Sequence, residues 1–344
     1  MQAPLAAHVA ILVADLDAAI ERWSRATGYT FSPVARYRTS FYSDHSDLQP
    51  HPHDARIAMS REGPPQIELM EFTGSGTHSA AQGEGFHHFG YTMVADLSSR
   101  RGELQAAGIG HDGESLTRDG DPLLWFTRPT DLNGVRLEFV APRTHPIVAD
   151  DGEPLPVSAD GQVNLFPLPV QPTAAPRIHH VGILVADLEQ ARERWARATG
   201  YTFGPVHHYR TDHYCDRSNP APHHHDARVS MTRDGPPHIE LMEFTGTGTH
   251  AAATGEGAHH LGFLDYPDLA GRMAHLATLG IGDDGRSLAP DGTLLLWFTA
   301  RDDLNGIRLE TVSTGPHPQP IFTESGEAVM LWLRPGTGKQ GGAP

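Results

Sequence analysis

Two histidines and two glutamates stand at points of the sequence where strands could bring their side chains together. His8 opens an apolar, β-branched run, and Glu68 lies inside another such run. His88 and Glu138 repeat this arrangement further along the chain. If the two segments face each other, two imidazoles and two carboxylates converge on one point. Such a set suits a divalent first-row metal ion with open positions for water or substrate.

The same set occurs a second time, 172 residues later. HVAILVADL at His8 recurs as HVGILVADL, GEGFHHFG recurs as GEGAHHLG, and DLNGVRLE recurs as DLNGIRLE. The ligand-type residues keep their types, whereas a nearby loop position changes from Ser40 to Asp212. An internal repeat of this kind predicts two copies of one structural unit, and up to two metal ions per chain. The residues of the second set are His180, Glu240, His260 and Glu310.

Short strands and capped helices are expected to position these residues. Residues 9–13 read as a strand, Asp15 as a helix N-cap and Gly28 as the helix stop. Side chains alternate between the two faces of a strand, so Glu68 would point inward and Glu71 outward, into solvent. The same alternation predicts that His87 and His259 point away from their ligand neighbours, and both are left out of the candidate set.

The pattern then restarts inside each repeat. We expect a strand at 88–94, a helix at 97–107, strands at 123–127 and 135–140, and a tight turn at Asn133–Gly134. Each repeat therefore holds two βαβββ modules, and the chain holds four, which predicts an α+β fold rather than a doubly wound parallel sheet. The first and second modules could pair with each other, or the first with the fourth. The predicted domains are 1–141 and 177–313, with a proline-rich connector arm at 142–176 and a C-terminal arm and disordered tail at 314–344.

A second cluster of polar residues falls in what reads as a loop between strands. Tyrosine, arginine and histidine side chains there could bind a polar or anionic substrate beside the metal. An equally good interpretation is a loop held by an arginine–aspartate pair, for which Asp54 is available. The candidate substrate-binding residues are Tyr37, Arg38 and His53, with Tyr209, Arg210 and His225 in the second repeat.

Composition excludes several classes of function. The formal net charge of −16 disfavours nucleic acid and anionic membranes as partners. The single cysteine, Cys215, permits no intrachain disulfide, and the single lysine, Lys339, lies in the Gly-rich tail, which argues against Schiff-base chemistry. The sequence shows no signal peptide and no membrane-spanning stretch. We therefore expect a cytoplasmic monomer or homodimer that acts on a small molecule.

As a set, the motifs HVAILV, IELMEF, GEGFHHFG and DLNGVRLEF resemble the glyoxalase I and methylmalonyl-CoA epimerase branch of the vicinal oxygen chelate superfamily. The resemblance covers nearly all of residues 6–140 and 178–313. It implies two glyoxalase-like domains, each built from paired half-barrel modules. It also implies that the metal ligands are the eight residues named above. Zinc, nickel, cobalt, manganese and iron all accept such ligands, so the sequence leaves the identity of the metal open.

The resemblance further implies a metal that acts as a Lewis acid on a carbonyl, with Glu138 and Glu310 as both ligand and proton acceptor. A metal-dependent isomerase or lyase is therefore expected. Three alternatives remain open. They are an extradiol-type Fe(II) dioxygenase, a metal-assisted hydrolase or ring-opening enzyme of specialised metabolism, and a metal-free drug-binding resistance protein. Two complete ligand sets argue against the first and the last of these.

Overall fold

Four βαβββ modules make up the computed structural model, which describes residues 4–155, 175–246 and 248–329. The α+β prediction is confirmed. The first half comprises β1 (His8–Val13), α1 (Leu16–Thr27), β2 (Ala35–Asp44), β3 (Asp47–Met59), β4 (Gln66–Glu71), β5 (Gly85–Tyr91), α2 (Leu97–Ala106), β6 (His111–Leu116), β7 (Pro122–Thr127) and β8 (Arg136–Val140). The second half repeats it with β10 (His180–Val185), α3 (Leu188–Thr199), β11 (His207–Asp216), β12 (His223–Met231), β13 (His238–Glu243), β14 (Gly257–Tyr266), α4 (Leu269–Thr278), β15 (Asp283–Leu288), β16 (Leu294–Thr299) and β17 (Arg308–Ser313).

Each half is a barrel whose eight strands close on themselves. In the first half the strand order is β3-β4-β1-β5-β8-β7-β6-β2, and pairing between β2 and β3 closes the ring. Strand β1 runs antiparallel to β5, and each runs parallel to the last strand of its own module. The first and second modules therefore share one barrel, which settles the pairing that the sequence left open. The four strands that carry the candidate ligands, β4, β1, β5 and β8, are consecutive neighbours in this ring.

The first helix of each half begins and ends where the sequence predicts. The Asp15 side chain accepts a hydrogen bond from the backbone N–H of Ala18, which satisfies one of the free donors at the start of α1. Gly28 ends the helix at a φ of 79°, a left-handed conformation that glycine adopts without strain. Trp23 is fully buried on the inner face of α1. In α3 the N-cap is Asp187, the glycine that ends the helix is Gly200, and the buried tryptophan is Trp195.

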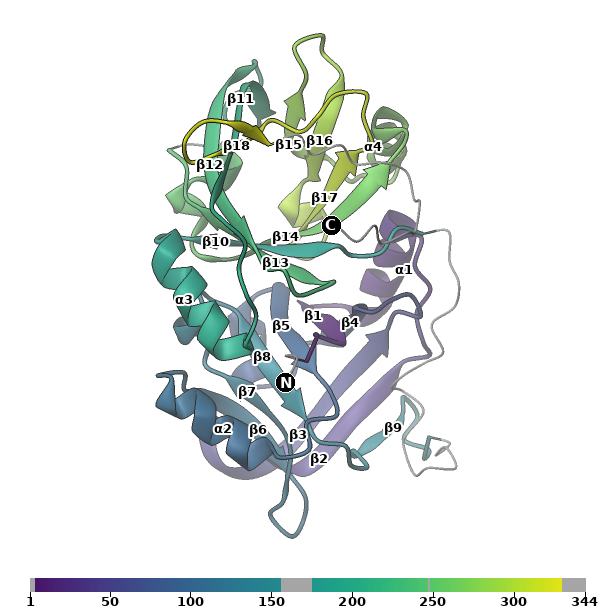
Figure 1. The fold of residues 1–344 in the computed structure, drawn as a ribbon. Coiled ribbons are helices and arrows are strands. Elements are labelled where there is room, and N and C mark those ends of the chain that lie inside the picture. Colours follow the sequence, from purple (N-terminus) through teal and green to yellow (C-terminus); the bar gives the residue numbers. More distant parts are fainter. Residues whose placement is uncertain (1–3, 156–174, 247, 330–344) are drawn as a thin grey trace, which may run out of the picture.

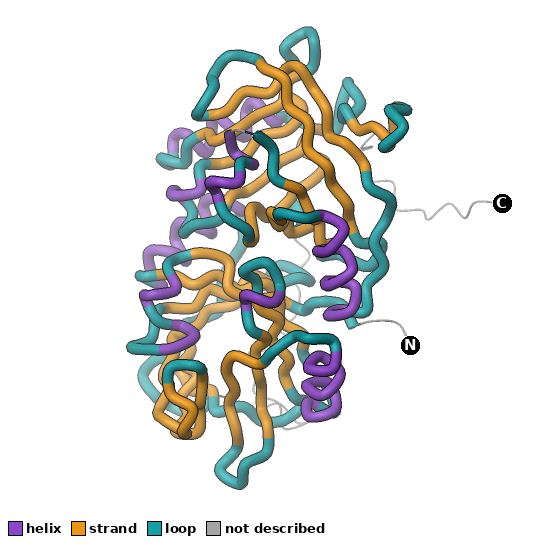
Figure 2. The backbone as a smooth tube through the Cα atoms, turned by 90° about the vertical axis from the view of Figure 1, so that its left-hand side faces the viewer, coloured by secondary structure: helices purple, strands orange, loops and turns teal. Residues whose placement is uncertain are grey.

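The two barrels pack against each other through one continuous core. Figure 1 shows the halves one above the other, and Figure 2 shows the helices on the outside of the strands. The indole N–H of Trp23 donates to Asn305 Oδ1 (3.0 Å), and that of Trp195 donates to Asn133 Oδ1 (3.1 Å). Asn133 and Asn305 occupy the predicted tight turns, at φ of 52° and 50°. The turn before each last ligand strand therefore also joins the two halves.

The segment that follows each barrel returns to it as an extra strand. β9 (Ile147–Ala149) pairs with β2, and β18 (Ile321–Thr323) pairs with β11. β18 in turn pairs with β19 (Ala328–Val329). Part of the predicted connector and the tail predicted to be disordered lie outside the described residues. Within the described part, none of the helices has the length and apolar character needed to cross a membrane.

Candidate metal centre

Four buried side chains meet inside the first barrel. The Nε2 atoms of His8 and His88 are 3.1 Å apart. Glu138 Oε2 lies 3.1 Å from His8 Nε2 and 3.4 Å from His88 Nε2. Glu68 Oε2 lies 3.4 Å from both imidazole nitrogens. The structure therefore brings the whole predicted set together, one residue from each of four adjacent strands.

The second barrel repeats the arrangement. His180 Nε2 and His260 Nε2 are 3.0 Å apart. Glu310 Oε2 lies 3.0 Å from His180 and 3.6 Å from His260, and Glu240 Oε2 lies 3.6 Å and 3.4 Å from the same two nitrogens. The two halves thus offer matching sets of donor atoms.

These spacings fit a single metal ion. Nitrogen and oxygen ligands bind zinc at about 2.0–2.1 Å, which places the donors of a tetrahedral site about 3.3–3.4 Å apart. The observed separations that involve an imidazole nitrogen, from 3.0 to 3.6 Å, bracket that value. Two imidazole and two carboxylate donors also match the ligand preferences of zinc and its first-row neighbours. Three donors in each barrel lie within 4.8 Å of one another: His8, His88 and Glu138 in the first, and His180, Glu240 and His260 in the second. The donor set in each barrel therefore fits a divalent ion held by two imidazoles and at least one carboxylate.

Opposite charges compensate one another within this buried set. Burial alone would lower the pKa of His88, but Glu138 and Glu68 raise it to about 9. Burial alone would raise the pKa of Glu138, but His88 and His8 hold it below its usual range. The carboxylates therefore favour a positive charge at the point where the four side chains meet.

The structure corrects the prediction that His87 points away from His88. Ala10 pairs with His88 and Ile11 with Phe86, so that His87 is the additional residue of a β-bulge. The bulge interrupts the alternation of β5 and turns His87 into the barrel rather than away from His88. Its Nδ1 lies 2.8 Å from His88 Nδ1, and its Nε2 lies 2.9 Å from the carbonyl oxygen of Thr77. His259 makes the matching contacts in the second half, at 3.0 and 3.1 Å.

The contacts of His87 determine which nitrogen of His88 carries the proton. The Thr77 carbonyl can only accept, so His87 Nε2 carries a hydrogen. Burial lowers the pKa of His87 well below the ordinary value, so the ring is neutral and its Nδ1 is an acceptor. His88 Nδ1 must then donate, so that Nε2 is the nitrogen directed at the other candidate ligands and the one that a metal ion would bind in place of a proton. A histidine that binds a metal through Nε2 needs this tautomer.

The predicted substrate cluster lies in paired strands rather than in a loop. β2 and β3 pair directly, with Thr39 opposite His53. Alternation along β2 turns Tyr37 into the barrel and Arg38 outward, where Arg38 Nε lies 3.0 Å from Asp54. Arg210 forms the same ion pair with Asp226, at 2.8 Å. The arginines therefore match the alternative of an arginine–aspartate pair, whereas Tyr37 and His53 line a cavity inside the barrel. Tyr209 and His225 repeat their ring contact in the second half.

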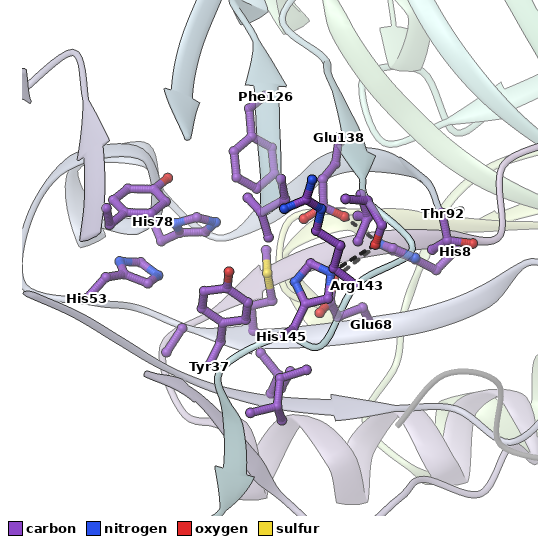
Figure 3. A pocket seen from close by; sticks show the side chains of 18 of the residues that line it. His8, Tyr37, His53, Glu68, His78, Thr92, Phe126, Glu138, Arg143 and His145 are labelled. Carbon is purple, nitrogen blue, oxygen red and sulfur yellow. Dashed lines mark hydrogen bonds and ion pairs between the residues drawn. The ribbon is translucent and has the colours of Figure 1, made fainter. Parts of the chain in front are cut away.

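This cavity reaches the candidate metal ligands (Figure 3). His8, Glu68 and Glu138 lie at one end, and His53 and His78 lie at the other. The walls between the ends are mostly apolar, and they include Ile57, Met70, Leu124, Phe126, Val140 and Ile147. Arg143 and His145, from the segment after β8, also line it.

The sequence reasoning missed two parts of this cavity. His78 recurs as His250 in the motif GTH, so the repeat contained a signal for it. His145 recurs in the same way as His317, whereas Arg143 carried no such signal, because Gly315 stands at its equivalent position. Trp125 and Trp297 are buried in the core, as predicted. Glu71 is on the outer face of β4, where it is bound to Arg56 rather than simply solvated.

Comparisons with known proteins agree with this architecture. The family model described as glyoxalase/bleomycin resistance protein/dioxygenase superfamily matches residues 7–120 and 179–285. A mutant of 4-hydroxymandelate synthase from Streptomyces coelicolor has a similar structure, with a TM-score of 0.56, 15% identity, and coverage of 91% of this chain and 93% of that chain. A 2,2',3-trihydroxybiphenyl 1,2-dioxygenase from Sphingomonas wittichii has a TM-score of 0.48 at 10% identity, with 91% of each chain covered. No curated protein sequence matches the chain. At these identities the structural likeness concerns the fold.

Proposed function

The chain belongs to the glyoxalase/bleomycin resistance protein/dioxygenase superfamily, and from this premise we propose that it is a metal-dependent enzyme of the isomerase or lyase type. The observation that carries the proposal is the meeting of His8, Glu68, His88 and Glu138 beside a cavity, repeated in the second barrel. The substrate would be a small molecule with a carbonyl or two neighbouring oxygens. Zinc, nickel, cobalt, manganese and iron all suit the donor set.

The protein's own residues have distinct roles in this proposal. The two imidazoles and two carboxylates of each barrel would hold the ion, which when bound supplies Lewis acidity toward an oxygen of the substrate. Glu138, whose carboxylate borders the cavity and keeps its negative charge, would accept a proton from carbon and return it to a neighbouring position. Glu310 would do the same in the second barrel.

The cavity walls would orient the substrate and keep water away from it. Tyr37 is held by a hydrogen bond from its hydroxyl group to Ser115 Oγ (2.8 Å), and the apolar walls limit the cavity to a small, largely desolvated guest. Tyr37 and His53, with Tyr209 and His225, remain the proposed substrate contacts. Arg38 and Arg210 leave that set, because each points outward into an ion pair.

The second carboxylate favours this reaction type over oxygen activation. Non-haem Fe(II) oxygenases use two histidines and one carboxylate, which leaves open positions on the metal. Here both barrels bring a fourth protein donor, Glu68 or Glu240, within 3.6 Å of the imidazoles. A metal-free binding protein is disfavoured as well, because each barrel keeps two imidazoles and two carboxylates that converge on one point.

Elemental analysis of protein purified without added metal tests the proposed centres. We expect about two ions per chain, and about one in each of the variants His8→Ala and His180→Ala. The control is His224→Ala, which removes an exposed histidine of β12 and should leave the metal content unchanged. A wild-type protein that holds no metal, and takes none up on soaking, would rule the proposal out.

The reaction type needs a separate experiment. The metal-loaded enzyme is incubated in D₂O with small carbonyl compounds that carry a neighbouring hydroxyl group, and exchange of the carbon-bound proton is followed by NMR. The double variant Glu138→Gln/Glu310→Gln should retain metal but exchange at least about 100-fold more slowly. Full exchange by that variant would contradict the glutamate role. Oxygen uptake in the presence of catechol would instead support the dioxygenase alternative.

A further inference from the structure

The end of the cavity opposite the metal ligands carries two buried imidazoles with hydrogen-bonding capacity to spare. His78 and His53 have exposed fractions of 4% and 8%. Within the described residues neither ring makes a hydrogen bond, and His78 Nδ1 is enclosed without a partner. Buried polar groups are nearly always paired, so rings of this kind need an explanation. Figure 3 shows both facing the cavity from the side away from His8 and Glu138.

Stacked rings hold these two imidazoles in place. Tyr42 stacks on His53 with ring centroids 4.2 Å apart, and His53 lies 5.1 Å from His78. His78 in turn lies 4.7 Å from His87, which bonds to the candidate ligand His88. The second barrel repeats the series with Tyr214, His225 and His250, at 4.3 and 5.1 Å. A group bound between such rings would meet a preorganised surface.

A short apolar section separates this end from the metal ligands. The Phe126 ring lies 5.2 Å from the His88 ring and 5.3 Å from the His78 ring. Met70 and Leu124 add to the same wall. One aromatic ring of the protein therefore spans the distance between the two polar ends. A guest that touches both ends needs an apolar part of about the same width.

The far end is suited to a neutral group. Burial lowers the pKa of His53 to about 4 and that of His78 well below the ordinary value, so both rings are uncharged near pH 7. The buried cation that acts on His78, Arg136, is already paired with Asp112 at 2.7 Å, and Arg143, which also lines the cavity, is paired with Asp121 at 2.6 Å. A carboxylate placed there would lose its hydration without gaining a positive partner, which is costly. Hydroxyl, carbonyl and amide groups can bond to neutral imidazoles.

We propose that this cavity takes a substrate with two polar ends, a pair of neighbouring oxygens that chelates the metal and a neutral hydrogen-bonding group that contacts His53 and His78, joined by a flat apolar section about one aromatic ring wide. The inference rests on the proposed function, because it assumes a metal at the first end. It adds a second recognition point and states the chemistry of the group bound there.

Three catechols distinguish the possibilities, because all chelate metal through the same two oxygens. They are catechol itself, 4-(hydroxymethyl)catechol with a neutral far group, and 3,4-dihydroxybenzoate with an anionic one. Binding is measured on the full chain carrying His180→Ala, loaded with Co²⁺, by titration of the Co²⁺ absorption bands, so that only the first barrel responds. We expect the hydroxymethyl compound to bind roughly five- to tenfold tighter than catechol, the gain of one neutral hydrogen bond. The carboxylate should bind more weakly than catechol.

Two variants locate the effect. His78→Phe and His53→Phe should each reduce the affinity for the hydroxymethyl compound to that for catechol, and either one suffices if the other does not fold. His45→Ala, at an exposed position, should keep the difference. Equal affinities of the wild-type site for catechol and the hydroxymethyl compound would overturn the inference while leaving the metal centre intact. Failure of Co²⁺ to bind, or of catechol to perturb its spectrum, would overturn the proposed function and this inference with it.

Discussion

His87 Nδ1 lies 2.8 Å from His88 Nδ1, and the other ring nitrogen of His87 bonds to the Thr77 carbonyl at 2.9 Å. This pair of hydrogen bonds fixes the tautomer of His88 and aims its Nε2 at Glu68 and Glu138. The orientation of a proposed metal ligand thus depends on a residue one position away in the same strand. Groups that orient metal ligands in this manner contribute strongly to metal affinity.

Replacement of His87 should therefore weaken metal binding without removing a ligand. We expect His87→Phe to lower the metal affinity of the first barrel by roughly 10- to 100-fold. His87→Gln should recover part of the loss, because its amide oxygen can accept from His88 Nδ1. The measurement is competition with a coloured chelator in the His180→Ala background. His259→Phe in that background is the matched control, and an equal loss there would contradict a local role for His87.

The turn at Asn133 should contribute to the stability of the whole chain. Its Oδ1 accepts from the Trp195 indole, and its Nδ2 donates to Glu256 Oε1 at 3.0 Å, both in the other half. Asn133→Ala would leave the buried indole N–H unpaired and place alanine at positive φ, for a loss of about 2–4 kcal/mol. Asn133→Gly removes the same contacts without the backbone strain and should lose less. Urea denaturation measures both, and equal losses would show that backbone conformation contributes nothing.

Repetition made the metal ligands and the first helices predictable. His8 and Glu138 kept their types across two copies, and Asp15 and Gly28 mark the ends of a helix by local rules alone. The side-chain direction of His87 was not predictable, because a bulge arises from the pairing of β5 with β1 and not from the sequence of β5. Arg38 was expected in a loop beside the metal, but it lies on the outer face of β2, and the pairing that places it there is not visible in the sequence of β2 alone.

Long-range pairing decided these cases. A stretch of ten residues with tyrosine, arginine and serine is read as a loop when it is considered alone. Its pairing with β3 is what makes it the strand β2. The choice between two module pairings also depended on contacts far apart in sequence, such as His8 with Gly90. The contribution of Arg143 to the cavity could not be foreseen, since Gly315 stands at the equivalent position of the second half.

Asp44 should make part of the stability depend on pH. Burial alone would raise the pKa of this carboxyl group, but hydrogen bonds from Ser46 and the Thr77 N–H lower it from 3.8 to about 2. Because the folded-state pKa is the lower one, the stabilisation is complete above about pH 4 and is lost as the pH falls toward 2. Asp44→Asn should thus cost about 2 kcal/mol at pH 6 and progressively less below pH 4. Urea unfolding at several pH values, with Asp119→Asn as an exposed control, checks this, and a cost that does not change with pH would contradict it.

Removal of metal should destabilise the folded chain. Two carboxylates and two imidazoles meet in each buried centre, with Glu68 and Glu138 both 3.4 Å from His88 Nε2. An ion bound there stabilises the native state by about 2.7 kcal/mol when it is present at 100 times its dissociation constant, because the unfolded chain lacks the site. A chelator should therefore lower the Tm of the wild type by several degrees, and added Zn²⁺ should restore it. The double variant His8→Ala/His180→Ala should show neither change. An unchanged Tm in wild-type protein whose metal has been removed, as verified by elemental analysis, would mean that protons compensate the buried carboxylates as well as a metal does.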